Sequence, residues 1–320
     1  MTVLILSSVT DVHAHAVMTE LAARGAAAEI VDLGDFPTRL RVSMAYRGGS
    51  RQFRLRRADG GELDLSAVHA VWWRRPQPFR LAPDIKDANA QRFALSEAST
   101  AFQGLYQSLN AFWINEPARD AVASHKPYQL TLAQELGLEI PETLITNDPG
   151  EARAFWRKYP GEVIHKQFIA LPETWRETRR LNEDEQKLDA SIAHAPVLFQ
   201  RHVPAIADLR VTVVGEQVFA AATDVSAALY PQDVRMNLDT RYHAHDLPEE
   251  TAGRLRALMR RLGLVYGAID LRLTPERRYV FLEINPAGQF LYIERATGQP
   301  IAQALADALA GKRERQRSAA

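Results

Sequence analysis

Two β-prone segments near the carboxyl end, 264–273 and 280–286, carry polar residues at positions that share one face. In the second segment, Glu283 and Asn285 are two residues apart, so on a strand both side chains point to the same side of the sheet. A short proline-containing stretch joins the two segments and is typical of a turn. We therefore expect a β-hairpin that places Asp270 beside Glu283 and Asn285.

Three oxygen donors facing one point suit Mg²⁺, which binds one or two carboxylates and leaves its other positions to water and nucleotide phosphate. The alternative is a polar sheet face in contact with water. Alternating apolar residues of the two segments are expected to fill the opposite face, namely Ile269, Leu271, Leu282 and Ile284. Since the acidic cluster then has no structural benefit of its own, we favour a metal site.

The composition describes a neutral globular protein without cysteine. Its 320 residues include 39 basic and 39 acidic side chains, so no net charge attracts it to nucleic acid or to an anionic membrane surface. Disulfides, thiolate metal sites and cysteine nucleophiles are excluded. The apolar start, Met1–Ser8, is short and lacks a basic leader, and no apolar run approaches transmembrane length. We expect a cytoplasmic protein with no nucleic-acid or membrane partner.

Lysine is rare in this chain, which makes a lysine in apolar surroundings informative. Only six of the 39 basic residues are lysine. Lys166 lies in the apolar, strand-like segment 163–168, and Lys126 opens a helical segment that extends to Leu136. An ammonium group is a compact point charge that arginine does not replace. These two lysines are therefore candidates for a binding site, whereas the other four fit exposed positions.

The pattern of apolar segments predicts a mixed α/β protein. The first third reads as a small open α/β domain, with a βαβ unit over 3–33, a meander over 41–65, a strand at 68–73, a helix at 87–109 and a strand at 112–115. Beyond it we expect helices at 126–136, 149–159, 249–262 and 300–310, and strands at 142–145, 163–168, 197–203, 209–214 and 217–223.

No glycine-rich phosphate loop accompanies these elements. Neither GxGxxG nor GxxxxGK[ST] occurs, so a Rossmann or Walker site is unsupported. Arg210 is a permanent planar cation suited to a phosphate or an acyl phosphate, and Gln200, a lone amide in an apolar strand, can pair with an adenine edge. A satisfied buried amide is an equal alternative for Gln200, and a structural ion pair is an alternative for Asp208 and Arg210.

The order of these residues along the chain resembles that of ATP-grasp ligases. Four motifs near the carboxyl end resemble, more narrowly, the graspetide synthetases, which are ATP-grasp enzymes of the microviridin type that modify ribosomal peptides: Asp233–Arg235, Gly267–Leu271, Phe281–Gln289 and Glu294–Ile301. Trp72–Pro76 resembles their amino-terminal domain, so the resemblance covers nearly the whole chain. The chain departs from the family pattern at Val234 and Phe290, where tryptophan is expected.

The resemblance implies an α/β (α+β) chain with an ATP-grasp fold preceded by an open α/β pre-ATP-grasp domain. The implied units are a pre-ATP-grasp domain (1–117), a central ATP-grasp subdomain (118–196), a carboxy-terminal subdomain with the metal site (197–311) and a basic tail (312–320). It further implies a homodimer.

The family chemistry implied by the resemblance is a two-step ligation. ATP phosphorylates an Asp or Glu side chain of a precursor peptide that has a leader and an acidic core. A Ser or Thr hydroxyl or a Lys amine of the same peptide then attacks the acyl phosphate, which closes an ω-ester or ω-amide macrocycle. Two alternatives stay open: a ligase that joins an amino acid to a separate peptide or protein, and a nucleotide-binding scaffold without turnover.

The resemblance also implies roles for individual residues, with ATP and Mg²⁺ as the bound groups. Mg²⁺ would be held by Asp270, Glu283 and Asn285. Nucleotide phosphates would be held by Lys126 and Lys166, and adenine by Gln200, Arg201, His202 and Val203. The catalytic residues would be Asp208, Arg210 and Arg235, with Arg210 at the acyl phosphate.

The segment Leu171–Glu185 is long, polar and without periodicity. Loops of this length inside compact domains are commonly lids or disordered. We predict a mobile lid that becomes ordered over the phosphates when ATP and peptide bind, with Arg179 or Arg180 meeting phosphate.

Overall fold

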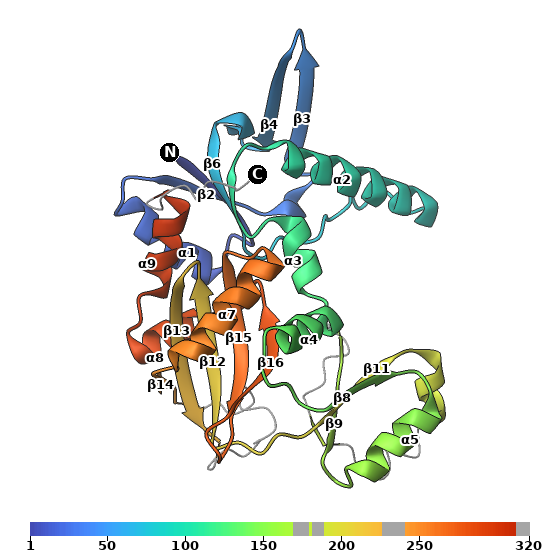
Figure 1. Cartoon of the computed structure of the whole chain (residues 1–320). Coiled ribbons are helices and arrows are strands. Elements are labelled where there is room, and N and C mark those ends of the chain that lie inside the picture. Colours follow the sequence, from blue (N-terminus) through green and yellow to red (C-terminus); the bar gives the residue numbers. More distant parts are fainter. Residues whose placement is uncertain (169–178, 181–188, 226–240, 312–320) are drawn as a thin grey trace.

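The computed structural model describes residues 1–168, 179–180, 189–225 and 241–311. This part of the chain is mixed α/β, as predicted, and its strands form four sheets. Figure 1 shows the amino-terminal sheet at one end with a hairpin projecting from it, and two further sheets, built from β8–β11 and from β12–β16, at the other end. None of its described helices is long and apolar enough to cross a membrane.

The amino-terminal sheet is parallel and has the strand order β2-β1-β6-β7. Successive side chains of β1 point to opposite faces of this sheet, as the period of two in a strand requires. On one face Val3 and Ile5 pack with α1 and α9, and on the other Leu4 and Leu6 pack with α2. The elements are β1 (Thr2–Leu6), β2 (Ala27–Val31), β6 (Val68–Trp73), β7 (Phe112–Ile114), α1 (Val12–Ala22), α2 (Ala88–Ser108) and α9 (Ile301–Leu309).

A second, antiparallel sheet of three strands confirms the predicted meander. It consists of β3 (Leu40–Arg47), β4 (Ser50–Arg57) and β5 (Glu62–Asp64). Gly48 and Gly49 join β3 to β4, and both have the positive φ angles that a tight hairpin turn requires. Phe53 and Leu55 pack one face of this sheet onto the amino-terminal core, so the opposite face is left to solvent.

The small sheet has the strand order β10-β9-β11-β8. Helix α5 (Pro149–Lys158) covers one face, where Trp156 packs edge-on against Phe199. The strands are β8 (Thr143–Thr146), β9 (Val163–Lys166), β10 (Arg179–Arg180) and β11 (Val197–Arg201). The predicted loop 171–185 thus contains two strand residues paired with β9; its other residues lie outside the described part, so the lid stays a prediction.

The large sheet is antiparallel and has the order β14-β13-β12-β15-β16. Helices α7 and α4 cover one of its faces. The strands are β12 (Ala207–Val214), β13 (Gln217–Asp224), β14 (His243–Ala244), β15 (Tyr266–Leu273) and β16 (Tyr279–Asn285). The helices around it are α3 (Pro117–Ala123), α4 (Lys126–Glu135), α7 (Glu249–Leu262) and α8 (Leu291–Thr297).

The predicted hairpin of β15 and β16 is confirmed, but one of its expected core residues is wrong. A register shift follows the pair Asp270–Glu283, so Leu271 lies opposite Phe281 and Leu282 is skipped. Phe281 therefore joins Ile284 in the apolar cluster under α7, in the place expected for Leu282. A bulge adds one residue to a strand and reverses the side chain's direction beyond it, and simple alternation cannot foresee that.

One hydrophobic core joins the amino-terminal and large sheets. It contains Val3 and Ile5 of β1 together with Tyr266 of β15 and the helices α8 and α9. Phe290 is fully buried in this core, where its ring lies edge-on to His13 and Tyr266. The departure from the family pattern at this position is therefore accommodated inside the protein, at the junction of the two sheets.

Candidate active site

The residues proposed for the metal lie together on the face of the large sheet opposite α7. Asp270 is directly opposite Glu283, and Asn285 is opposite Ala268, two residues along β15. In the described part of the chain, no cluster of three His, Cys, Asp or Glu side chains could hold a metal ion. A metal here would take two carboxylates and an amide oxygen, a donor set that fits Mg²⁺.

Each of the two carboxylates contacts a cationic side chain. The Lys126 ammonium, at the start of α4, donates to Glu283 Oε2, and Arg210 Nη1 of β12 donates to Asp270 Oδ1 at 2.7 Å. A carboxylate offers about four lone-pair positions, so both groups keep acceptor capacity for a metal. The fold thus brings Lys126 and Arg210 to the residues proposed for the metal, whereas Lys166, the other lysine proposed for the phosphates, lies on the small sheet.

Arg210 is a buried, permanently charged group. Burial opposes its charge, but the Asp270 carboxylate together with the nearby Tyr292 and Tyr266 outweighs this effect and raises the pKa of the guanidinium above its ordinary value. Arg210 also donates from Nη2 to the carbonyl of Gln289 at 3.3 Å. A fixed cation beside two carboxylates is suited to stabilise negative charge that develops on a transferring phosphoryl group.

Asp208 and Arg210 do not pair with each other. Asp208 lies opposite Arg272 of β15, as Arg210 lies opposite Asp270, and it accepts two hydrogen bonds from Arg272, at 2.8 and 3.3 Å. The structural ion pair considered for Asp208 therefore exists, with Arg272 as the partner. Sequence reasoning missed Arg272, although it stands two residues after Asp270 in the same strand and so faces the same side.

Arg272 also connects the large sheet with the segment that leaves β11. Its Nη1 donates to the carbonyl of Val203 at 2.8 Å and lies 3.2 Å from Nε2 of His202. The backbone N–H groups of Arg201 and His202 donate to the carbonyls of Glu142 and Glu162. Those two amide protons are therefore already engaged, and a nucleotide base would use other groups of this segment.

Gln200 and Lys166 share the face of the small sheet that α5 does not cover. Gln200 is only 2% exposed, and its Nε2 donates to Thr143 Oγ1 at 3.0 Å. Its buried Oε1 has no hydrogen-bond partner within the described residues. Lys166 lies opposite Leu198 of β11. Because Leu198 and Gln200 are two positions apart on that strand, the side chains of Lys166 and Gln200 point to the same side of the sheet. Arg235 lies outside the described residues.

A buried asparagine that follows β7 ties β15 and the loop after β16 to the amino-terminal sheet. Asn115 donates from Nδ2 to the carbonyls of Tyr266 and Pro286, at 2.8 and 3.0 Å. Its Oδ1 accepts from the backbone N–H groups of Val265 and Tyr266, at 2.9 and 3.0 Å. One side chain therefore fixes the start of β15 and the residue that follows Asn285.

Arg74, also missed as a site residue, supports the loop after β16. It is 1% exposed, donates from Nε to Asp11 Oδ2 at 3.2 Å, and donates from Nη1 to the carbonyls of Ala287 and Gly288. A Cβ at Gly288 would lie 2.4 Å from the Ala268 side chain and 2.8 Å from Arg210 Nη2. The backbone therefore approaches the site so closely that only glycine fits.

The comparisons with known proteins agree with this geometry. Residues 119–309 match the RimK-like ATP-grasp domain, and residues 2–121 match the MvdD pre-ATP grasp domain. The chain is an ATP-grasp ligase of the graspetide-synthetase family. The ligase is accordingly an ADP-forming enzyme of a family that binds ATP and Mg²⁺.

Solved structures of similar proteins cover almost the whole ligase. The macrocyclase MdnC of Microcystis aeruginosa MRC, bound with precursor peptide MdnA, is 31% identical, with a TM-score of 0.86 over 97% of this chain and 100% of that one. A RiPP-associated ATP-grasp ligase of Chryseobacterium gregarium, in complex with ADP and a leader and core peptide, is 26% identical, with a TM-score of 0.88 over 98% and 97%. The macrocyclase MdnB is 30% identical, with a TM-score of 0.81 over 96% and 98%. No curated protein matches the chain in sequence.

Proposed function

We propose that this ATP-grasp ligase closes ω-ester or ω-amide macrocycles in a ribosomal precursor peptide that has a leader and an acidic core. The observation that carries the proposal is the constellation on the large sheet. Two carboxylates, an amide oxygen and a buried arginine converge beside Lys126. The similarity to macrocyclases over nearly the full length of both chains supports the peptide as substrate.

In the proposed first step, a side-chain carboxylate of the peptide attacks the γ-phosphorus of ATP, which gives an acyl phosphate and ADP. Asp270, Glu283 and Asn285 would hold Mg²⁺, which neutralises phosphate charge as the phosphoryl group moves. Arg210, fixed by Asp270 and by the Gln289 carbonyl, would bind the acyl phosphate. Asp208 orients Arg272 on the same face, and Arg235 completes the proposed catalytic set.

Nucleotide binding is assigned to residues of helix α4, of the small sheet and of the segment that follows β11. Lys126 and Lys166 would hold the phosphates. The buried Oε1 of Gln200, unpartnered within the described residues, would accept from the adenine amino group, and the Arg201–Val203 segment, including His202, would line the base. Satisfying a buried orphan acceptor is favourable because leaving one unpaired costs about 1–3 kcal/mol.

In the proposed second step, a hydroxyl or amine of the same peptide attacks the acyl carbon, and phosphate leaves. The attacking group loses its proton, so the sum of both steps is the loss of one water per ring. Preorganised peptide groups at high effective concentration react without a strong base. The proposal includes a homodimer and a cytoplasmic location. It also divides the chain into the pre-ATP-grasp domain (1–117), the central (118–196) and carboxy-terminal (197–311) ATP-grasp subdomains, and the basic tail (312–320).

Mass spectrometry of a co-expressed peptide tests this function. The probe is a short acidic peptide encoded beside the ligase gene and rich in Thr, Ser or Lys. We expect a loss of about 18 Da per ring closed by this condensation, and tandem fragmentation that is blocked within each ring. A mass increase by one amino acid would instead support ligation between separate molecules, and ATP-dependent ADP release with no peptide product would contradict macrocyclisation.

A further inference from the structure

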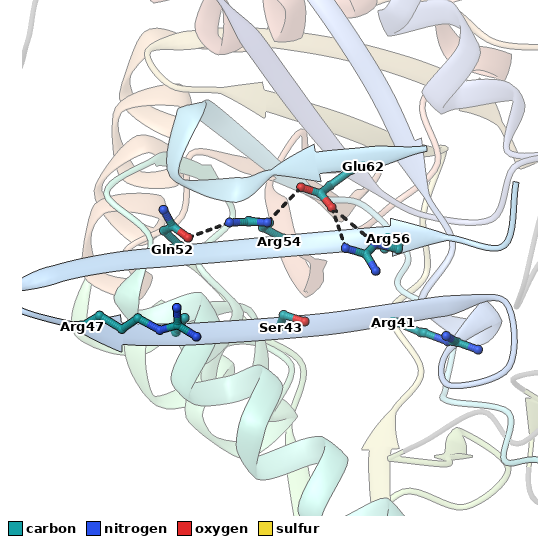
Figure 2. A pocket seen from close by; sticks show the side chains of 8 residues that line it. Arg41, Ser43, Arg47, Gln52, Arg54, Arg56 and Glu62 are labelled. Atoms are coloured by element: carbon teal, nitrogen blue, oxygen red, sulfur yellow. Dashed lines mark hydrogen bonds and ion pairs between the residues drawn. The ribbon is translucent and has the colours of Figure 1, made fainter. Parts of the chain in front are cut away.

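The outer face of the β3–β4–β5 sheet carries a cluster of arginines that the active site does not use. Alternation along two paired strands places Arg41 and Arg47 of β3 on the same side as Arg54 and Arg56 of β4. Figure 2 shows these side chains along the two strands, with Glu62 of β5 beside them. They line a hollow of about 370 Å³ together with Ser43, Ala45, Gln52 and Glu62. We call this surface the arginine face.

The positive charge of the arginine face is only partly neutralised. The Glu62 carboxylate forms ion pairs with both Arg54 and Arg56, with N–O distances of 3.4 and 3.1 Å. Arg41 and Arg47 have no ion pair with any described residue. Arg41 also lies directly opposite Arg56, and like charges at opposite positions of a strand pair are destabilising. In a chain whose net charge is zero, such a concentration of cations indicates an anionic ligand.

The edge of this sheet offers a second means of recognition. β3 is an edge strand of eight residues that pairs with β4 alone within the described chain. Its outward N–H and C=O groups can pair with an added strand, a common mode of peptide binding. Side chains at alternate positions of such a peptide would point to the same side as Arg41 and Arg47.

We propose that the arginine face and the outer edge of β3 bind an extended, acidic segment of the peptide substrate, with carboxylates at alternate positions meeting Arg41 and Arg47. The inference rests on the proposed function for the identity of its ligand. Figure 1 shows the β3–β4 hairpin projecting from the amino-terminal sheet, away from the β12–β16 sheet that carries the catalytic charges. Binding there tethers the peptide and raises its effective concentration at the active site.

Two other occupants of this surface are less favourable. A second copy that paired its β3 antiparallel to this β3 would place Arg41 near Arg47 of the other copy, so the added strand would increase the repulsion. Single-stranded nucleic acid is bound largely by stacking on aromatic side chains, and the residues that line the arginine face include none. An acidic peptide satisfies the charge and the strand edge together.

Fluorescence anisotropy tests the proposal without requiring turnover. The probe is a fluorescein-labelled peptide of alternating threonine and glutamate, and the control probe replaces each glutamate with glutamine. Arg47→Gln and Arg51→Gln form a matched pair, since both positions lie at the exposed hairpin tip but on opposite faces of the sheet. We expect binding about threefold weaker for Arg47→Gln, about tenfold weaker for Arg41→Gln/Arg47→Gln, and unchanged within about twofold for Arg51→Gln.

The same variants separate this inference from the proposed function. With a peptide that the ligase cyclises, Arg41→Gln/Arg47→Gln should raise KM and leave kcat unchanged, and added salt should remove the difference. Equal binding of the glutamate and glutamine probes, equal weakening by Arg51→Gln, or tighter binding of a labelled oligothymidylate would each overturn the inference. Probe binding that behaves as expected, without any ring closure, would refute macrocyclisation and leave the docking surface standing.

Discussion

The two sheets that flank the proposed nucleotide site are held in very different ways. The large sheet is fixed by buried polar side chains from distant parts of the chain: Asn115 bonds to β15 and to the loop after β16, and Gln129 of α4 bonds to both the N–H and the C=O of Ile284. The small sheet has its own apolar core under α5, including Trp156 and Phe199. A polar contact between the two sheets runs from Arg272 Nη1 to the carbonyl of Val203, in the segment that leaves β11.

This difference assigns different mechanical roles to the two sheets. Charges that stabilise a transition state are most effective when they cost no reorganisation at the moment of reaction, and the large sheet holds Asp270, Glu283 and Arg210 on such a frame. A nucleotide must enter and leave, which suits a unit that has a separate apolar core of its own. Four predictions test whether the large sheet is the rigid, chemical side and the small sheet the nucleotide-binding side.

Glu283→Gln should have the largest effect. The variant keeps the shape of the side chain but removes one anionic donor from the proposed metal site, and we expect ADP formation with peptide to fall about a thousandfold with little change in Tm. Asp270→Asn should lose activity and also about 3 kcal/mol of stability, because Arg210 stays buried without its partner. Glu276→Gln, in the exposed turn between the same strands, is the control. Wild-type turnover of Glu283→Gln at saturating Mg²⁺ would refute the metal assignment.

Asn115→Ala should destabilise the protein more than any comparable change in the small sheet. It leaves two buried N–H groups and two buried carbonyls with fewer partners, which we expect to cost about 3 kcal/mol. Gln200→Leu removes one hydrogen bond together with an unpaired acceptor, so its cost should stay within about 1 kcal/mol while nucleotide affinity falls. Urea unfolding measures both, with Asn110→Ala at an exposed site as control. Similar losses for Asn115→Ala and Gln200→Leu would remove the distinction between the sheets.

Acidification should weaken the junction between the amino-terminal and large sheets. Burial and, next in size, the nearby Arg74 guanidinium together lower the pKa of His13 from 6.5 to about 4. Since this histidine is neutral in the folded protein, its contribution to the free energy of unfolding is complete above pH 6.5. The contribution is lost as the pH falls from 6.5 toward 4. The shift of 2.5 units (6.5 minus 4) sets an upper limit of about 3 kcal/mol, with about 2 kcal/mol lost by pH 5.

The measurement for this prediction is urea unfolding at pH 7.5 and pH 5. Wild type should lose about 2 kcal/mol more than His13→Gln between these two values, whereas His15→Gln, at an exposed position of the same helix, should behave as wild type. If wild type and His13→Gln respond equally to acid, the neutral imidazole is not part of what holds the junction together.

Lys166→Arg should have the smallest of these effects. The forked guanidinium is a poor substitute for a compact ammonium in a packed strand, and we expect Mg·ATP to bind about tenfold more weakly, with no change in the free energy of unfolding. Isothermal titration calorimetry reports the affinity. Lys158→Arg, an exposed lysine on α5, serves as control. Unchanged binding in Lys166→Arg would mean that the small sheet does not hold the phosphates through this residue.

Features with a short range along the chain could be predicted from the amino-acid sequence. The β15–β16 hairpin, its pairing of Asp270 with Glu283, helix α7 and the strand β6 follow from apolar periodicity and turn residues over fewer than about 20 residues. The resemblance to graspetide synthetases depended on motifs of the same local kind. These patterns can be recognised in the sequence because side-chain direction repeats every two residues in a strand and every 3.6 residues in a helix.

The positions of partners far apart in the chain were decided by the tertiary structure. Lys126 contacts Glu283, Arg74 supports Gly288, and Asn115 joins β7 to β15, yet none of these pairs has a signature in its own segment. The bulge after Asp270 also moved Phe281 into the core in place of Leu282. Periodicity fixes which face a residue occupies only while the register is regular, and packing between segments decides which buried polar groups find one another.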